Sequence, residues 1–173
     1  AIRAANLILS LSFFKDSKLI TKEFLFYFLK NIFIHGEHIV DNLEYYSITS
    51  NHYLSDVSGL IFIAEIFSDF NIGKKWKKFA VSKLKKEMKK QVYNDGVDFE
   101  ASTCYHRLVL ELFFSPVLYT VRNSGDFNKI NFVERCKHIY TTYHSDERCN
   151  MNELILFCLK PNGKLPQIGD NDN

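Results

Sequence analysis

The sequence NHYLSDVSGLIFIAEIFSDF, residues 51–70, places apolar side chains at helical spacing behind two polar residues, Asn51 and His52. This pattern predicts a helix over about residues 51–70. Serine and acidic side chains interrupt its apolar run, which stays shorter than the ~18 residues that a membrane-spanning helix needs. We therefore expect a core helix of a globular domain and no membrane span.

Helical spacing continues on both sides of this stretch, and no segment alternates with the period of a strand. Thr21 is a favourable N-cap, residues 71–73 have the composition of a helix C-cap, and residues 94–96 form a strong turn. Pro116 is expected to kink or split its helix. The predicted helices cover about residues 2–14, 21–40, 51–70, 74–93, 102–121, 127–143 and 152–159.

This order of helices predicts an all-α fold. Alternate helices begin near residues 1, 51, 102 and 150, and helix pairs of this length suit an array of antiparallel α-hairpins or an (α/α) toroid. We expect one partial toroid domain over residues 1–173, truncated at both ends, because the chain begins without Met inside a helical pattern and stops just after a loop. In such an array the helices near 51 and 102 run in the same direction, so their N-termini lie at the same end.

The composition limits the partners and the metal chemistry. The chain has 173 residues, 46% of them hydrophobic, which suffices for one sizeable core. A formal net charge of +2 is far from that of a dedicated nucleic-acid binder, so we expect no nucleic-acid partner. The cysteines form no C-x-x-C pair, and the histidines lack metal spacing with carboxylates, so neither a metal nor a cofactor is expected. We expect free thiols at Cys104, Cys136, Cys149 and Cys158.

Residues 74–90 hold nine lysines and a single glutamate. Trp76, Phe79, Leu84 and Met88 give this segment one apolar stripe. Such a segment is most often a solvated outer face of a helix. The alternative is a surface that attracts a polyanion.

Two polar clusters stand at the heads of predicted helices: Asn51 with His52, and residues 102–107. The structural interpretation is that Asn51 caps the first helix and that Ser102 or Thr103 caps the second. The functional interpretation is a proton-transfer site, in which an ionisable group faces a group that stabilises the charge it creates. The two are compatible, because a capping asparagine can still present its amide to a groove.

The order and spacing of these residues resemble the heparinase II/III-like family of polysaccharide lyases, including their alginate-lyase relatives. The similarity covers nearly the whole chain, and the 54 residues that separate Asn51 from Tyr105 suit that family. The other positions that carry the resemblance are Arg3, Asn6, residues 42–44, His52, Trp76, Asp95, Gly96, Glu100, Ser102, His106 and residues 161–170.

The resemblance implies β-elimination on acidic, uronic-acid polysaccharides such as heparin, heparan sulfate or alginate, that is, a carbon–oxygen lyase. It implies an (α/α) toroid that is normally followed by a β-sandwich region, which this chain lacks, and a periplasmic or secreted location. It also implies that Asn51 binds the uronate carboxylate and that Tyr105 acts as catalytic base, acid or both. His52 contributes in some members, and a further catalytic histidine lies downstream. The expected substrate-binding residues are Arg107, His106, Glu100 and Asp170.

The residue types suit this chemistry. The proton that must be removed is α to a carboxylate, and hydrogen bonds from Asn51 and His52 to that carboxylate would stabilise the resulting carbanion. Each such donor is worth roughly 10²–10³-fold in rate. Tyrosine has an ordinary pKa of ~10, so a tyrosine base needs nearby cations that lower this pKa. Arg107 and His106 are the candidates for that charge.

Two alternatives stay open. The first is a non-catalytic glycan-binding or polysaccharide-assembly protein on the same scaffold, suggested by the lysine-rich segment and the missing half of the cleft. Such a protein would bind polyanions in a salt-sensitive way and form no product. The second is a glycoside hydrolase, which would need two carboxylates facing each other across a cleft. Asp98 and Glu100 are the candidates, although their proximity in sequence is more typical of one loop face.

Overall fold

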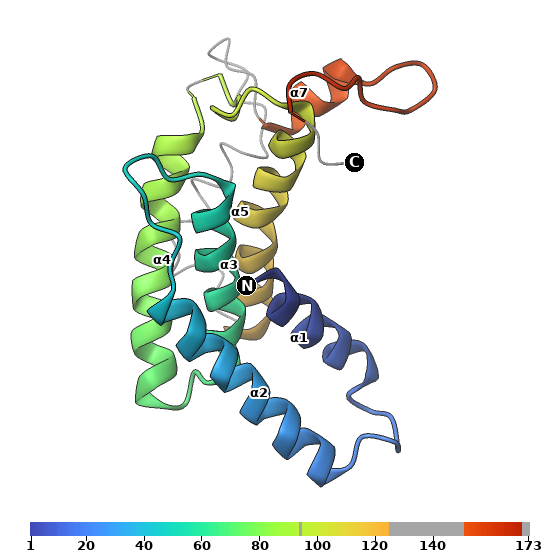
Figure 1. The fold of residues 1–173 in the computed structure, drawn as a ribbon. Coiled ribbons are helices and arrows are strands. Elements are labelled where there is room, and N and C mark those ends of the chain that lie inside the picture. Colours follow the sequence, from blue (N-terminus) through green and yellow to red (C-terminus); the bar gives the residue numbers. More distant parts are fainter. Residues whose placement is uncertain (94, 125–150, 171–173) are drawn as a thin grey trace. The chain divides into compact units, whose positions relative to one another are not determined.

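The computed structural model describes residues 1–93, 95–124 and 151–170. These residues confirm the all-α class: they contain six helices and no strand, apart from one isolated antiparallel bridge between Val92 and Asp98. The helix expected over residues 127–143 lies outside the described residues. The helices, shown in Figure 1, are α1 (Ile2–Phe14), α2 (Lys22–Asp41), α3 (Asn51–Ile66), α4 (Asn71–Gln91), α5 (Thr103–Ser124) and α7 (Met151–Cys158).

The first two helices begin and end close to their predicted bounds. Thr21 caps α2 as expected, because its Oγ1 accepts a hydrogen bond from the Phe24 amide at 3.1 Å. At the other end of α2, the amide of Asn42 donates to the carbonyl of His38 at 3.0 Å. Local signals of this kind depend on a few neighbouring residues, so they can be recognised in the sequence.

The boundary between α3 and α4 differs from the prediction. Helix α3 ends at Ile66, and Asn71 to Gly73 form the first turn of α4 rather than a C-cap of α3. The glycine is needed for a close approach: a Cβ atom on Gly73 would clash with the carbonyl of Phe67. The expected capping role of residues 71–73 is therefore wrong, because the turn is closed by backbone contact instead of a left-handed cap.

Helix α5 also differs, because it continues through Pro116 as one helix. Proline removes one backbone hydrogen bond. Pro116 is buried, and its neighbours Leu112, Phe113 and Val117 belong to the apolar core, so their packing outweighs that loss. Of the two outcomes expected at Pro116, a kink or a split, the split does not occur.

The chain forms two compact units, residues 1–83 and residues 84–173. In the first unit, α1 and α2 both contact α3, which is buried along most of its length (Figure 1). Rings of Phe33, Phe67 and Trp76 form a cluster with centroids 5.4–6.5 Å apart. Through this aromatic cluster, α2 and the end of α3 pack against α4.

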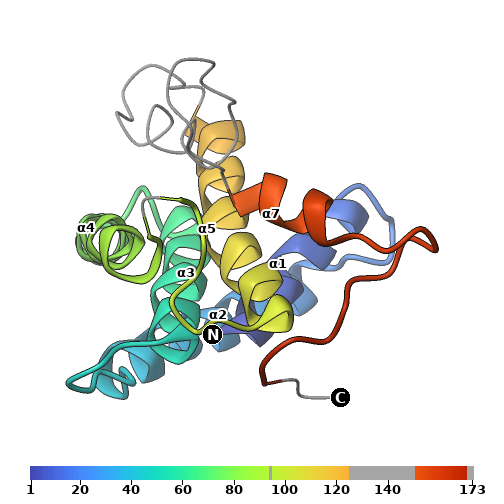
Figure 2. The same ribbon diagram turned by 90° about the horizontal axis from the view of Figure 1, so that it is seen from above.

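In the second unit, α7 contacts α5, and Figure 2 shows the two helices side by side. The core of this unit includes Val109, Phe113 and Met151. No described helix is long and apolar enough to cross a membrane. The expectation that residues 1–173 form one partial toroid domain stays a prediction.

Candidate active site

Asn51 is the first residue of α3, and the N-cap position belongs to Ser50, whose backbone is extended (φ −130°, ψ −164°). The expected capping role of Asn51 is therefore wrong. Its backbone carbonyl accepts a hydrogen bond from Ser55 Oγ at 2.7 Å, and the residue is only 8% exposed. The helix thus holds the Asn51 amide in a restricted, mostly buried place.

His52 points into a polar cluster on the surface. Its Nδ1 lies 3.1 Å from Glu44 Oε2, and both side chains are about half exposed or more, so solvent screens the pair. The Glu44 amide in turn donates to Asp56 Oδ2 at 3.0 Å. Burial raises the pKa of the Asp56 carboxyl, and the hydrogen bond from Glu44 partly offsets this. In the sequence, the only signal for this cluster is the polar stretch that precedes α3.

Tyr105 lies in the first turn of α5, and a cap fixes its backbone. Ser102 Oγ accepts a hydrogen bond from the Tyr105 amide at 3.2 Å, and the Ser102 carbonyl accepts from the His106 amide at 2.8 Å. The prediction that Ser102 caps this helix is confirmed. The Tyr105 side chain is half-buried, while that of Arg107, two residues on, is exposed.

His106 is 2% exposed and hydrogen-bonded at both ring nitrogens. Its Nδ1 accepts from the Asp98 amide at 3.2 Å, and its Nε2 lies 2.8 Å from the Met151 carbonyl. This pattern requires the neutral tautomer with the proton on Nε2. Burial lowers the pKa of His106, against the opposing effect of the Met151 bond. In this form His106 supplies no positive charge, and binding a substrate would require the loss of one of these bonds.

Residues 166–170 are tied to the head of α5. Thr103 Oγ1 donates to the Pro166 carbonyl at 2.7 Å and accepts from the Ile168 amide at 3.3 Å. The Thr103 amide donates to the Ile168 carbonyl at 3.0 Å, and Ser102 Oγ donates to the Asp170 carbonyl at 2.6 Å. This set of four bonds, called the clasp below, places the exposed Asp170 beside Ser102. The sequence contains no local signal for the clasp, because its partners are more than 60 residues apart.

Two residues with positive φ allow the backbones to approach each other at the clasp. Gly169 has φ +77°, and a Cβ atom there would lie 2.8 Å from the Ala101 carbonyl oxygen. Ala101 itself has φ +54°, which is uncommon for a residue with a side chain. The local backbone is therefore held in an unfavourable conformation by its surroundings, as is often found near functional sites.

Asp98 is the residue that sequence analysis undervalued. It is 1% exposed; its Oδ2 accepts from the Glu100 amide at 3.3 Å, and its Oδ1 has no partner among the described residues. Burial, reinforced by the charge of Glu100, raises the pKa of Asp98 to about 6. The two acids occupy one loop instead of facing each other across a cleft, which disfavours the glycoside hydrolase alternative.

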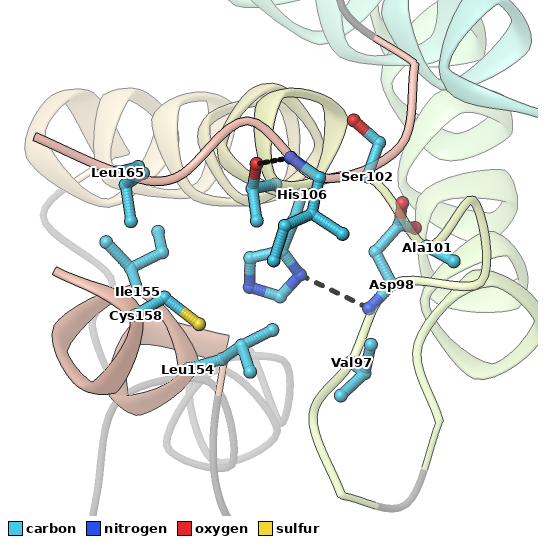
Figure 3. Close-up of a pocket in the computed structure, with 11 residues that line it drawn as sticks. Val97, Asp98, Ala101, Ser102, His106, Leu154, Ile155, Cys158 and Leu165 are labelled. Atoms are coloured by element: carbon cyan, nitrogen blue, oxygen red, sulfur yellow. Dashed lines mark hydrogen bonds between the residues drawn. The ribbon is translucent and has the colours of Figure 1, made fainter. Parts of the chain in front are cut away.

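A cavity of about 220 Å³ lies against this loop. Figure 3 shows the His106 ring beside the cavity, with the side chains of α7 on one side and the loop of Asp98 on the other. Tyr105 is not part of the lining, so this cavity is not the expected catalytic groove. The lining is mostly apolar and consists of Val97, Asp98, Ala101, Ser102, Thr103, His106, Leu154, Ile155, Cys158, Leu165 and Ile168.

The described part of the chain contains no cluster of three or more His, Cys, Asp or Glu side chains that could hold a metal ion. Cys104 and Cys158 are free, half-buried thiols, whereas Cys136 and Cys149 lie outside the described residues.

The expected site residues fall into two groups. Asn51 and His52 lie in the first unit, and Tyr105 lies in the second unit. The clasp and the loop after α4 bring the rest of the second group to the same end of α5 as Tyr105. That the two groups face one groove stays a prediction. The remaining members of the second group are Glu100, His106, Arg107 and Asp170.

A family model described as Heparinase II/III N-terminus matches residues 1–171. A heparin-sulfate lyase from Bacteroides stercoris is 32% identical over 126 residues, which cover 70% of this chain and 18% of that protein. A heparin-sulfate lyase from Pedobacter heparinus is 25% identical over 169 residues, which cover 98% of this chain and 24% of that protein. The chain thus spans less than a quarter of the length of these relatives. No solved structure matches it significantly.

Proposed function

This chain belongs to the heparinase II/III family, whose N-terminal region it matches, and from this we propose that it is part of a lyase that cleaves uronic-acid polysaccharides by β-elimination. The match over residues 1–171 carries the proposal, because it includes both Asn51 and Tyr105. Two relatives are named heparin-sulfate lyases, which favours a heparin- or heparan-sulfate-like substrate over alginate.

The proposal includes an incomplete (α/α) toroid. Helices α1 to α5 are 13 to 22 residues long and follow one another without an intervening strand in the described residues, which suits an array of antiparallel hairpins. The rest of the full-length protein would supply a β-sandwich region and the further catalytic histidine. In this arrangement, Asn51 and Tyr105 approach the substrate from the heads of α3 and α5.

In the proposed reaction, the Asn51 amide donates a hydrogen bond to the uronate carboxylate, with His52 as a second donor. This withdraws charge from the carboxylate and stabilises the carbanion that forms when the α-proton leaves. Tyr105, ionised as phenolate, takes that proton. The electron pair of the C–H bond forms a carbon–carbon double bond, and the glycosidic C–O bond breaks. The proton then passes to the leaving oxygen, from Tyr105 or from a second acid.

The charge that ionises Tyr105 does not come from His106, because that ring is neutral in its hydrogen-bonded form. This corrects the expectation that His106 lowers the pKa of the tyrosine. Arg107 is exposed at the head of α5 and stays a candidate for that charge. A guanidinium group at this position would attract both the phenolate and an acidic substrate.

The substitution Tyr105→Phe in the full-length protein tests the proposal. It removes the phenol that transfers the proton, so we expect the formation of unsaturated uronate, followed by its ultraviolet absorbance, to fall at least about 10³-fold. Tyr93→Phe is the matched control: the Tyr93 ring is 58% exposed, and that variant should keep its activity. Unchanged product formation by Tyr105→Phe would remove this residue from the mechanism.

The runner-up is a glycan-binding protein without catalytic activity, which the lysine-rich helix α4 favours. The same measurement separates the two proposals. A full-length protein that binds heparin but forms no unsaturated product from any uronic-acid polysaccharide would support the runner-up and contradict the lyase.

A further inference from the structure

We propose that one face of α4 is a binding surface for sulfated polysaccharide that does not include Asn51 or Tyr105. The lysine face, as we call it, consists of Lys74, Lys75, Lys78, Lys86 and Lys89, and all five side chains are exposed. The choice of ligand rests on the proposed function, whereas the surface itself follows from the geometry and charge of α4.

The geometry of α4 gathers these lysines on one side. Because α4 is one continuous helix (Figure 1) with 3.6 residues per turn, the five positions fall within an arc of about 120°. The opposite side carries the buried Trp76, Ala80 and Leu84. The apolar stripe thus faces the protein core and the lysine face points to solvent, as the sequence predicted.

No acidic side chain of α4 neutralises this face. Glu87, the single acid among residues 74–90, is buried, and its Oε2 accepts a hydrogen bond from Gln91 Nε2 at 2.8 Å. Lys77, which is not part of the lysine face, forms an ion pair with Glu65 at 2.7 Å. Lys83 lies over the ring of Tyr45 instead. Among the described residues, no acidic side chain pairs with a lysine of this face, and there its positive charge is open to a ligand.

The charge is concentrated on this helix. Residues 74–90 hold nine of the 22 basic side chains and one of the 20 acidic ones, which leaves 13 basic and 19 acidic side chains elsewhere in the chain. A helix that only needs to be soluble usually mixes both signs. Here Lys74 and Lys78, four residues apart, repel each other instead, and such a pair destabilises a helix. A bound polyanion would relieve this repulsion.

The shape of the lysine face fits a long, linear anion. From Lys74 to Lys89 it extends about 22 Å along the helix, which is too long for one small anion. The other positions of α4 within the same arc, Asn71, Ser82 and Lys85, are not aromatic, whereas surfaces for single-stranded nucleic acid use aromatic rings on which bases stack. A sulfated sugar chain, with charges repeated along its length, matches a row of point charges.

Such a surface would affect the association of the substrate with the protein and not the rate of the catalytic step. A concentrated positive field raises the local concentration of an anionic chain and speeds its association, and salt weakens both effects. The lysine face would therefore lower KM for long chains and leave kcat unchanged. Oligosaccharides too short to contact the lysine face while they are bound at the catalytic residues would gain nothing.

The binding test compares two variants of the full-length protein. The first carries Lys74→Gln, Lys78→Gln, Lys86→Gln and Lys89→Gln. The matched control loses the same charge at four exposed lysines outside α4, with Lys15→Gln, Lys18→Gln, Lys22→Gln and Lys30→Gln. Affinity for immobilised heparin is measured over a series of salt concentrations.

We expect the α4 variant to bind heparin about 10- to 100-fold more weakly at low salt, while the control stays close to the unmodified protein. The slope of log affinity against log salt should fall by about 1 for each lysine that contacts the chain. Equal losses in both variants, or no loss in the α4 variant, would overturn the proposal. So would duplex DNA that binds as tightly as heparin and is released by the same substitutions, because the surface would then be a general polyanion site.

Kinetics separate this proposal from the proposed function. On long heparin chains the α4 variant should show a raised KM and an unchanged kcat, and on a tetrasaccharide it should match the unmodified protein. A raised KM on the tetrasaccharide would contradict the lysine face. If the unmodified protein forms no unsaturated product at all, the lyase proposal fails, and the heparin-binding measurement still decides the present one.

Discussion

Burial raises the pKa of the Asp98 carboxyl, whose Oδ1 has no hydrogen-bond partner among the described residues. Its pKa in the folded protein is about 6, above the ordinary value of 3.8. The folded state therefore holds the proton more tightly than the unfolded state does. The resulting stability is fully present below pH 3.8 and is lost as the pH rises to 6. At neutral pH the ionised Asp98 thus destabilises the fold.

The substitution Asp98→Asn tests this titration. It keeps the shape of the side chain and removes the charge, so the free energy of unfolding at pH 7.5 should rise by about 1–3 kcal/mol. Urea denaturation from pH 4 to 7.5 should show that the loss of stability between pH 3.8 and 6 has become smaller. Asp95→Asn is the control, because Asp95 is exposed and its Oδ1 acceptor is kept. Identical pH profiles of Asp98→Asn and the unmodified protein would contradict the assignment.

The sequence can identify candidate site residues, but it does not reveal their environment. Asn51 and Tyr105 stand out because each is part of a polar cluster at the head of an apolar helix. Asp98 is one of three acids between residues 95 and 100, and nothing local distinguishes it. Its burial depends on His106, eight residues on, and on the bridge with Val92. Contacts of this kind arise only when the chain has folded.

Among the elements, the turn between α3 and α4 depends on Gly73. We expect Gly73→Ala to lower the free energy of unfolding by about 1–3 kcal/mol, because the added methyl group would overlap the carbonyl of Phe67. Ser82→Ala, at an exposed position of the same helix, should stay within about 0.5 kcal/mol. Thermal or urea denaturation measures both. A neutral Gly73→Ala variant would mean that the turn can open without affecting α3 or α4.

The elements also show which signals in a sequence are reliable. The start of α2 is predictable from the sequence because a cap such as Thr21 acts within a few residues. Residues 71–73 were misassigned because a glycine before a lysine-rich segment has the same composition as a C-cap. At Pro116 the helix continues without the expected split, because the local cost of proline is outweighed by the core around it. The close approach of Gly73 to the Phe67 carbonyl decides the first case, and burial of the segment around Pro116 decides the second.

For the whole molecule, His106 joins three segments: α5, the loop of Asp98 and the first residue of α7. We expect His106→Phe to lower the free energy of unfolding at pH 7.5 by about 2–5 kcal/mol. The phenyl ring leaves the buried amide of Asp98 without this acceptor, which costs about 1–3 kcal/mol, and it removes the hydrogen bond to the Met151 carbonyl, worth about 0.5–1.5 kcal/mol. Urea denaturation measures this loss.

The pH dependence of stability gives a second measurement of the same role. Since the pKa of His106 is lowered from 6.5 in the folded protein, its contribution is present above pH 6.5 and is lost as the pH falls below that value. The His106→Phe variant should lack this acid-dependent loss. His52→Gln, at an exposed position, should retain it. A His106→Phe variant as stable as the unmodified protein would mean that these two hydrogen bonds are not needed.

The clasp between Thr103 and residues 166–168 closes a loop of more than 60 residues. Closing a loop costs chain entropy, and the hydrogen bonds at its ends offset this cost only while they are formed together. Amide hydrogen exchange should therefore report the opening of this segment as one event, in which the amides of Thr103 and Ile168 lose protection at the same rate. After a proteolytic cut within the enclosed stretch, this junction and the packing of α7 on α5 would together keep the two pieces associated.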